Sequence, residues 1–298
     1  MKITKLNEEP IERFNYLNAI PGGDVAEAQL PIYHGTVSGL PEGVDALIVA
    51  SDLQGIIPVP RENGHQKTTD MTTGTEPGMD RLLGEMLPAH VRLLLEVEWP
   101  EIDPGRVGVL LCGDLYARRG KRGASGNPVP VWLAFREAFG WVAGIDGNHD
   151  LTDVAGAHRL QSGEGIHYMD VPAVIGAGPP GGPVPRGAVQ SQLLRIAGLG
   201  GIIGRPDKPN RLPEKHYLQS VNKLLKQQPD CLLLHQSPGI PEHGLMGEPL
   251  IRQALEAGPE TVVFCGHTHW DTPLVQLKNG TQIVNADSKL FILTRYIS

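Results

Sequence analysis

The feature that most constrains this chain is a series of short apolar runs, each of which ends in glycine or polar residues. The runs occupy residues 46–50, 107–112, 141–145, 193–197, 231–234 and 261–265. Runs of this length that are bounded by turn residues predict buried β-strands. Between them lie helical patterns at 79–97, 129–139, 214–227 and 249–256, and Pro88 is expected to split or kink the first. Strands that alternate with helices predict a layered α/β fold.

The two ends of the chain follow other patterns. Segments 273–277, 282–285 and 290–295 are predicted to be strands, with a strong hairpin signal at Asn279-Gly280 and a weaker one at Asp287-Ser288. We therefore expect antiparallel strands to close the sheet. Residues 1–44 lack a strong period, and we predict that they form an N-terminal extension packed on a main domain of residues 45–298.

Composition excludes several classes of protein. The 298 residues are 40% apolar and 20% charged, which is typical of a packed globular chain and not of a disordered one. The formal charge of −7 argues against a protein that coats nucleic acid. The sequence has no apolar run of membrane-spanning length and begins without the apolar core of a signal peptide. Because the three cysteines are odd in number and lie in or beside apolar runs, we expect reduced thiols and a cytoplasmic protein.

Polar residues of metal-ligand or acid–base type follow five of the predicted strands. They are Asp52, Gln54, Asp114, Asn148, His149, Asp150, His235, His267 and His269. Functional groups of α/β sheets gather past the carboxyl ends of strands. The i and i+2 spacing of Asp52 and Gln54, and of His267 and His269, would aim both side chains of each pair the same way in extended backbone. Carboxylate, amide and imidazole ligands without cysteine suit manganese, iron or zinc.

In this order, the motifs resemble those of the calcineurin-like metallophosphoesterases, from about residue 45 to the end. The residues that carry the resemblance are Asp52-Leu53-Gln54, Gly113-Asp114, Gly147-Asn148-His149-Asp150, His235 and Gly266-His267-Thr268-His269. The resemblance implies a four-layer αββα sandwich, in which two mixed β-sheets are flanked by helices. It also implies hydrolysis of phosphomonoesters or phosphodiesters at a centre of two divalent ions, for which manganese is favoured and iron, zinc, nickel and magnesium are alternatives.

The resemblance also assigns roles to these residues. The first ion would be bound by Asp52, Gln54 and His269, the second by Asn148, His235 and His267, and both by Asp114. Hydroxide activated by the metals would attack phosphorus, while His149 would act as the general acid and Asp150 would orient its ring.

Two positions depart from the family pattern. Gln54 stands where most members have histidine, and its neutral amide oxygen is a weaker ligand, so we expect the first ion to bind more weakly. Ala117 stands where many members have an aspartate. These changes leave open a second interpretation, a non-catalytic binding scaffold with a degraded first metal site. A nuclease is a third interpretation, against which the net negative charge weighs.

Cations crowd the loop after Asp114, namely Arg118, Arg119, Lys121 and Arg122. Either they form a solvated charge run or one or two of them contact substrate phosphate, which arginine binds through two parallel hydrogen bonds. Arg118 is the favoured candidate, because its place after Asp114 resembles that of the substrate arginine in phosphoprotein phosphatases. Arg119, Tyr116 and His243 are further candidates, and the polar insertion at 56–78 is a candidate for overhanging the site. The expected partner is a small-molecule phosphate ester.

Overall fold

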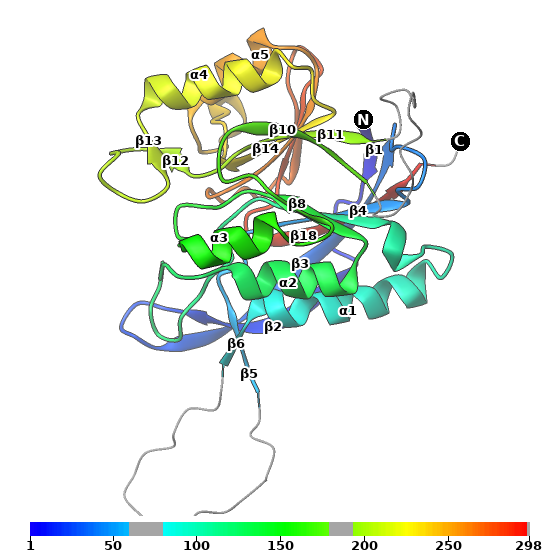
Figure 1. The fold of residues 1–298 in the computed structure, drawn as a ribbon, viewed down its shortest axis with the longest axis vertical. Helices are drawn as coiled ribbons and strands as arrows, with labels where there is room; N and C mark the ends of the chain where they lie inside the picture. The colour runs from blue at the N-terminus through cyan, green and yellow to red at the C-terminus, as the bar shows by residue number, and fades with distance from the viewer. Residues whose placement is uncertain (60–79, 179–192, 297–298) are drawn as a thin grey trace, which may run out of the picture.

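Two large sheets lie between two groups of helices in the computed structural model, which describes residues 1–59, 80–178 and 193–296 (Figure 1). The first sheet has the spatial order β6 (Asp80–Leu82), β5 (Ile56–Pro58), β2 (Glu12–Ala19), β3 (Val25–Ser38), β18 (Lys289–Arg295), β4 (Ala46–Ser51), β7 (Val107–Leu111), β8 (Trp141–Gly144) and β9 (Ile166–Tyr168), and β1 (Lys2–Leu6) pairs with β3. The second has the order β10 (Ala173–Ala177), β11 (Leu194–Leu199), β14 (Cys231–Gln236), β15 (Val262–Gly266), β17 (Gln282–Asn285) and β16 (Leu274–Gln276). A short parallel pair, β12 (Ile202–Ile203) and β13 (Arg211–Leu212), lies outside both sheets.

The six apolar runs are confirmed as strands β4, β7, β8, β11, β14 and β15. Every residue of β4, β7, β8 and β15 is buried, which explains why their sequences are continuously apolar rather than alternating. β4, β7 and β8 are parallel neighbours in the first sheet, and β11, β14 and β15 are parallel neighbours in the second. The carboxyl ends of each parallel set therefore meet at one edge of their sheet, as the site requires.

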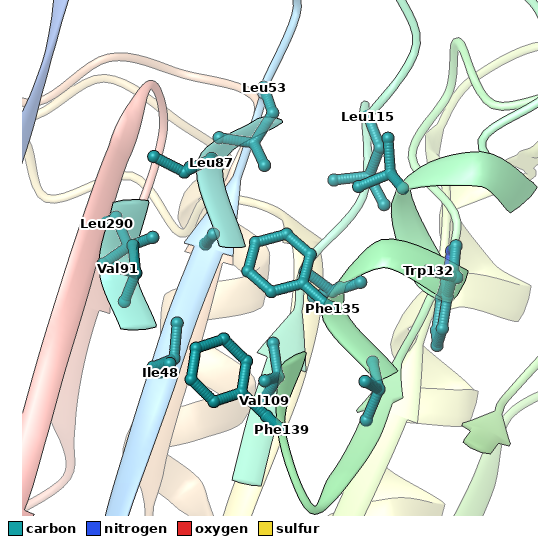
Figure 2. Close-up of a cluster of buried hydrophobic side chains, with 14 of the residues drawn as sticks. Ile48, Leu53, Leu87, Val91, Val109, Leu115, Trp132, Phe135, Phe139 and Leu290 are labelled. Atoms are coloured by element: carbon teal, nitrogen blue, oxygen red, sulfur yellow. The ribbon is translucent and has the colours of Figure 1, made fainter. Parts of the chain in front are cut away.

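Three helices cover one face of the first sheet: α1 (Leu83–Glu98), α2 (Val129–Ala138) and α3 (Val154–Gln161). Figure 2 shows Val91 of α1 and Phe135 of α2 packed over Ile48 and Val109 of the sheet. α1 runs through Pro88 without a break, so the expected split is wrong. The apolar side of α1, which includes Pro88, is buried, and this packing outweighs the roughly 3 kcal/mol that proline costs inside a helix.

A second apolar layer separates the two sheets, and a third lies beneath the remaining helices. Because side chains alternate along a strand, Leu47 and Val49 of β4 face Phe264 and Val284 of the second sheet, away from α1. α4 (Glu214–Leu225) and α5 (Pro249–Ala257) pack on the outer face of that second sheet. α3 has no counterpart among the helices expected from the sequence. Its one local signal is the N-cap Asp153, whose carboxylate accepts the N–H of Gly156 at 2.6 Å.

The N-terminal segment contributes strands to the first sheet itself. β3 pairs with β2 on one side and with β18 on the other, and Leu30 and Ile32 of β3 are fully buried beneath the helices. The C-terminal hairpin at Asn279-Gly280 is confirmed, since β16 and β17 are antiparallel. The hairpin expected at Asp287-Ser288 is wrong, because β18 leaves the second sheet there and pairs with β3 and β4 of the first.

Other expectations are met in part by the described residues. Cys112, Cys231 and Cys265 are buried and free of disulfides. In the described part of the chain, no helix combines the length and the apolar character needed to cross a membrane. Of the insertion at 56–78, only β5 and the residue after it belong to the described ranges, and residues 60–78 lie outside them.

The buried contacts of β3 predict that the N-terminal segment is essential to stability. Ile32→Ala should lower the free energy of unfolding by about 2–5 kcal/mol, because it leaves a cavity between the sheet and α1. Ile20→Ala, at an exposed position just after β2, should change it by no more than about 0.5 kcal/mol. Urea unfolding of both variants measures the difference, and similar small effects would contradict the integral role of β3.

Candidate metal centre

Three residues of the predicted set stand after parallel strands in a left-handed backbone conformation. Asp52 follows β4, Asp114 follows β7 and His267 follows β15, with φ values of 53°, 55° and 67°. Non-glycine residues rarely adopt such values, and the strain is concentrated at functional sites. The i and i+2 spacing predicts extended backbone that aims both side chains of each pair in the same direction. That geometry is wrong, because Asp52 and His267, the first residues of the two pairs, lie in tight turns.

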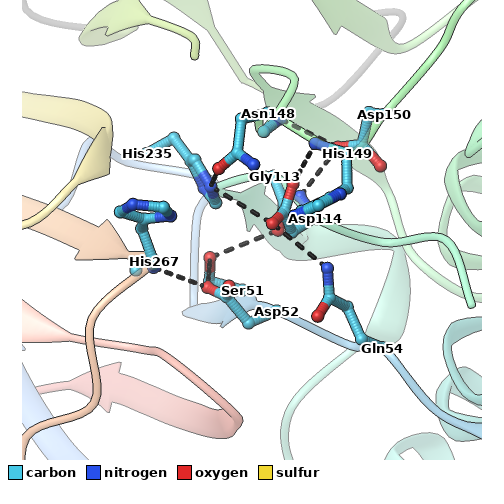
Figure 3. A network of polar contacts seen from close by, with 12 residues as sticks. Ser51, Asp52, Gln54, Gly113, Asp114, Asn148, His149, Asp150, His235 and His267 are labelled. Carbon is cyan, nitrogen blue, oxygen red and sulfur yellow. Dashed lines mark hydrogen bonds and ion pairs between the residues drawn. The ribbon is translucent and has the colours of Figure 1, made fainter. Parts of the chain in front are cut away.

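The carboxylate of Asp114 is the centre of the cluster (Figure 3). Its Oδ2 lies 3.4 Å from His235 Nε2 and accepts a hydrogen bond from Gln54 Nε2 at 3.1 Å. Its Oδ1 accepts the backbone N–H of His149 at 2.7 Å. Asp114 therefore contacts Gln54 after β4, His149 after β8 and His235 near the end of β14.

One half of the cluster combines oxygen and imidazole donors. Asp114, His235 and His267 each bring one ligand atom, and these atoms all lie within 4.8 Å of one another. Asn148 adds its Oδ1, which is 3.2 Å from His235 Nε2. Nδ1 of His235 lies 2.9 Å from the Cys112 carbonyl, and a proton donated there leaves Nε2 free for a metal. This donor set fits a divalent ion of the manganese, iron or zinc type.

Burial and proximity shift the pKa values of these groups strongly. Burial alone would lower the pKa of His235, but the Asp114 and Asp52 carboxylates raise it to about 10. Burial and the charge of His235 lower the pKa of His267 to about 4. Burial would raise the pKa of Asp114, yet the neighbouring His235 lowers it. Without metal, a proton on His235 thus supplies the positive charge that the carboxylates attract.

The other half of the cluster surrounds Asp52. Oδ2 of Asp52 accepts the backbone N–H of His267 at 2.9 Å and the hydroxyl of Ser51 at 2.7 Å. His269 is more than half exposed, and its Nδ1 lies 2.9 Å from Asp287 Oδ2. Gln54 directs its amide nitrogen to Asp114. The two other predicted ligands of this half, Gln54 and His269, therefore have different partners, Asp114 and Asp287.

Asp150 has a different task from the one expected for it. Its carboxylate accepts three backbone N–H groups, from Asp114 at 2.7 Å, Leu115 at 2.9 Å and Gly147 at 2.8 Å. Among the described residues, the ring of His149 instead pairs through Nδ1 with Ser125 Oγ at 3.1 Å. The expectation that Asp150 orients the His149 ring is therefore wrong. Its carboxylate holds the loops after β7 and β8 together.

A cavity of about 340 Å³ opens beside the cluster. Asp52, Gln54, His267 and His269 of the cluster line it, together with residues 16–19 of β2 and residues 116–119 and 121–124 of the basic loop. Tyr116, Arg118 and Arg119 all line the cavity, whereas His243 is exposed and lies outside the described lining. Arg119 is held by Asp80 through two hydrogen bonds of 2.8 and 2.7 Å. His149 lies against Gly123 of the cavity wall.

Two residues of the site were missed by the sequence reasoning. Asp287 lines the cavity beside the metal cluster, but its sequence context resembles a turn. Asn210, with a φ of 52°, lies between β12 and β13. Its Nδ2 donates hydrogen bonds to the carbonyls of Gly147 at 2.8 Å and Asp150 at 2.7 Å and so fixes the loop of residues 147–150. An asparagine followed by Arg211 and Leu212 carries no local signal for that contact.

The chain matches a model of a known protein family. A family model described as calcineurin-like phosphoesterase matches residues 46–271, which is most of the chain. The matched range includes all the predicted metal ligands but ends before Asp287. The search of the curated proteins finds no match.

The three hydrogen bonds of Asp150 predict that its two acceptor oxygens are essential to the site. Asp150→Asn turns a donor toward backbone N–H groups, and each group left without an acceptor should cost about 1–3 kcal/mol of unfolding free energy. The affinity for divalent metal should fall as well, because the turn that carries Asp114 loses its hydrogen bond to Asp150. Asp153→Asn makes the same chemical change three residues away, at a helix N-cap where Asn serves as well as Asp. Equal, mild effects in urea unfolding would contradict this role.

Proposed function

The chain belongs to the calcineurin-like phosphoesterase family, and we propose that it is a metal-dependent phosphoesterase that hydrolyses a small phosphomonoester or phosphodiester. The observation that carries the proposal is the position of Asp114. One carboxylate oxygen faces His235 and Gln54, and the other faces the His149 backbone. In this central position one carboxylate would be able to serve two ions. The three apolar layers of the fold support the order helix, sheet, sheet, helix of a four-layer sandwich.

Two divalent ions, of which manganese is our first choice, would supply an activated hydroxide and neutralise phosphate charge. Asn148, His235 and His267 would hold the second ion, and Asp52, Gln54 and His269 the first, with Asp114 between them. His149 would donate a proton to the leaving oxygen from Nε2, because its Nδ1 pairs with Ser125. The His149 ring lies beside Gly123, which lines the cavity.

The cavity supports a small anionic substrate. Its volume of about 340 Å³ is that of a small-molecule site, and the cations Arg118, Lys121 and Arg122 line it together with residues of the cluster. No described residue forms an ion pair with the Arg118 guanidinium, so this side chain is available to a phosphate oxygen. Arg119 is committed to Asp80, which argues for Arg118 as the substrate ligand.

A binding scaffold is the second candidate, and one observation favours it. Gln54 directs its amide nitrogen to Asp114, and that nitrogen cannot bind a metal ion, so only the neutral amide oxygen, a weaker ligand, is left for the first site. A scaffold would bind one ion or none and would hydrolyse no phosphate ester. The presence of His149 beside the cavity weighs against it, because a scaffold needs no general acid.

The role of His149 predicts an effect that depends on the leaving group. With manganese, His149→Ala should lower kcat by about 10²–10⁴-fold on an alkyl phosphate, whose leaving oxygen needs a proton, and far less on p-nitrophenyl phosphate. Asp114→Asn should abolish turnover of both esters and of bis-p-nitrophenyl phosphate. His158→Ala, at an exposed position of α3, is the matched control and should behave as wild type. Equal losses on both esters would exclude the general-acid role, and absence of metal-dependent turnover would exclude the enzyme.

The two neighbouring arginines predict opposite kinetic outcomes. Arg118→Met should raise KM by about tenfold or more and change kcat less, because a charge-assisted contact to phosphate contributes about 1.5–3 kcal/mol. Arg119→Met should leave KM within about twofold, since its guanidinium is bound to Asp80. Steady-state kinetics on the best substrate found measures both variants. A rise in KM for Arg119→Met alone would reverse the assignment.

A further inference from the structure

Asp287 lies at the point where the chain crosses from one sheet to the other. It lies between β17 and β18, and its backbone forms an isolated β-bridge with Ser51, the residue before Asp52. It is 9% exposed and lines the cavity together with Asp52 and His269. The crossover therefore delivers a buried carboxylate to the half of the site that would hold the first ion.

The contact that Asp287 makes is specific to one nitrogen of His269. Oδ2 of Asp287 lies 2.9 Å from Nδ1, so the imidazole donates its proton there and keeps the lone pair of Nε2 free. Because the His269 side chain is 59% exposed, its ring has little packing to fix its orientation. The hydrogen bond to Asp287 supplies that constraint.

The charges around Asp287 also favour a cation. Asp52, a predicted ligand of the first ion, lines the same cavity as Asp287, so two carboxylates lie in this half of the site. The nearest ammonium is that of Lys289, which is buried and donates to the backbone carbonyl of Asp287 at 3.0 Å, not to its carboxylate. The carboxylate of Asp287 remains directed at His269.

Gln54 leaves this half of the site short of one imidazole. Its amide is neutral, and its nitrogen is engaged with Asp114. We propose that Asp287 is a positioning residue of the first metal site, where it orients His269 and adds negative charge to a site that lacks one imidazole ligand. The inference rests on the proposed function, since it takes the first site of the phosphoesterase centre as its premise.

The test is Mn²⁺ binding to the full chain after removal of metal, measured by titration calorimetry with stoichiometry from elemental analysis. Wild type should bind two ions with different affinities. Asp287→Asn should weaken the weaker site by about 10–100-fold and leave the tighter one unchanged, which is the range seen for hydrogen-bond partners of metal ligands. Adding Gln54→His to Asp287→Asn should recover much of the loss.

Two further variants separate a positioning role from a general effect of charge. Asp271→Asn removes a fully exposed carboxylate 3.8 Å from Nε2 of the same histidine and should change neither site. His269→Gln should weaken the same site as Asp287→Asn, and in the double variant the two losses should not add. If Asp287→Asn does not fold, His269→Gln still tests the premise that His269 holds the weaker site, and an unchanged weaker site in that variant would overturn the proposal.

Several outcomes would overturn the inference. These are a wild type that binds only one ion, an Asp287→Asn variant that weakens both sites alike or neither, an equal effect of Asp271→Asn, and additive losses in the double variant. Turnover is measured separately on the same samples. Two bound ions with the expected pattern but without phosphate-ester hydrolysis would uphold the role of Asp287 while refuting the proposed function.

Discussion

The geometry of the site depends on the buried carboxylate of Asp150. It gathers three backbone N–H groups from the loops after β7 and β8, so the turn that carries Asp114 and the turn that carries Asn148 are fixed relative to each other. Burial and the nearby carboxylates of Asp114 and Asp146 raise the pKa of Asp150 to about 7, while the backbone donors oppose the shift. Several carboxylates crowd this site, an arrangement that suits a cation. Hydrogen-bond donors offset the cost of this crowding at Asp52, Asp114 and Asp150.

Local sequence signals were enough to predict the parts of the fold that are buried on both faces. The strands that carry Asp52, Asp114 and His267 are short, apolar and bounded by glycine or polar residues, so they are recognisable without any knowledge of their neighbours. The convergence of these residues followed from a rule of topology, since parallel strands end at the same edge. The way each side chain is aimed did not follow, because it depends on left-handed turns that spacing alone does not reveal.

Long-range pairing explains what the sequence could not predict. β3 is half-buried along much of its length, and its place between β2 and β18 depends on a partner about 260 residues away. Asp287-Ser288 has the composition of a hairpin turn, and only the pairing of β18 with β4 makes it a crossover. Likewise, the link between His149 and Ser125 joins two loops that are distant in sequence. Local composition identifies residues that can do chemistry, whereas tertiary contacts decide which of them act together.

The two imidazoles beside Asp114 differ in how readily they accept a metal. His267 has a pKa of about 4 and is neutral near pH 7, so its nitrogen lone pair is already free. His235, whose pKa the carboxylates raise to about 10, carries a proton, which an incoming ion must displace. The proton and the metal ion compete for the same negative potential, centred on Asp114 and Asp52. The carboxylates that attract a metal ion to this site therefore also make its binding release a proton from His235.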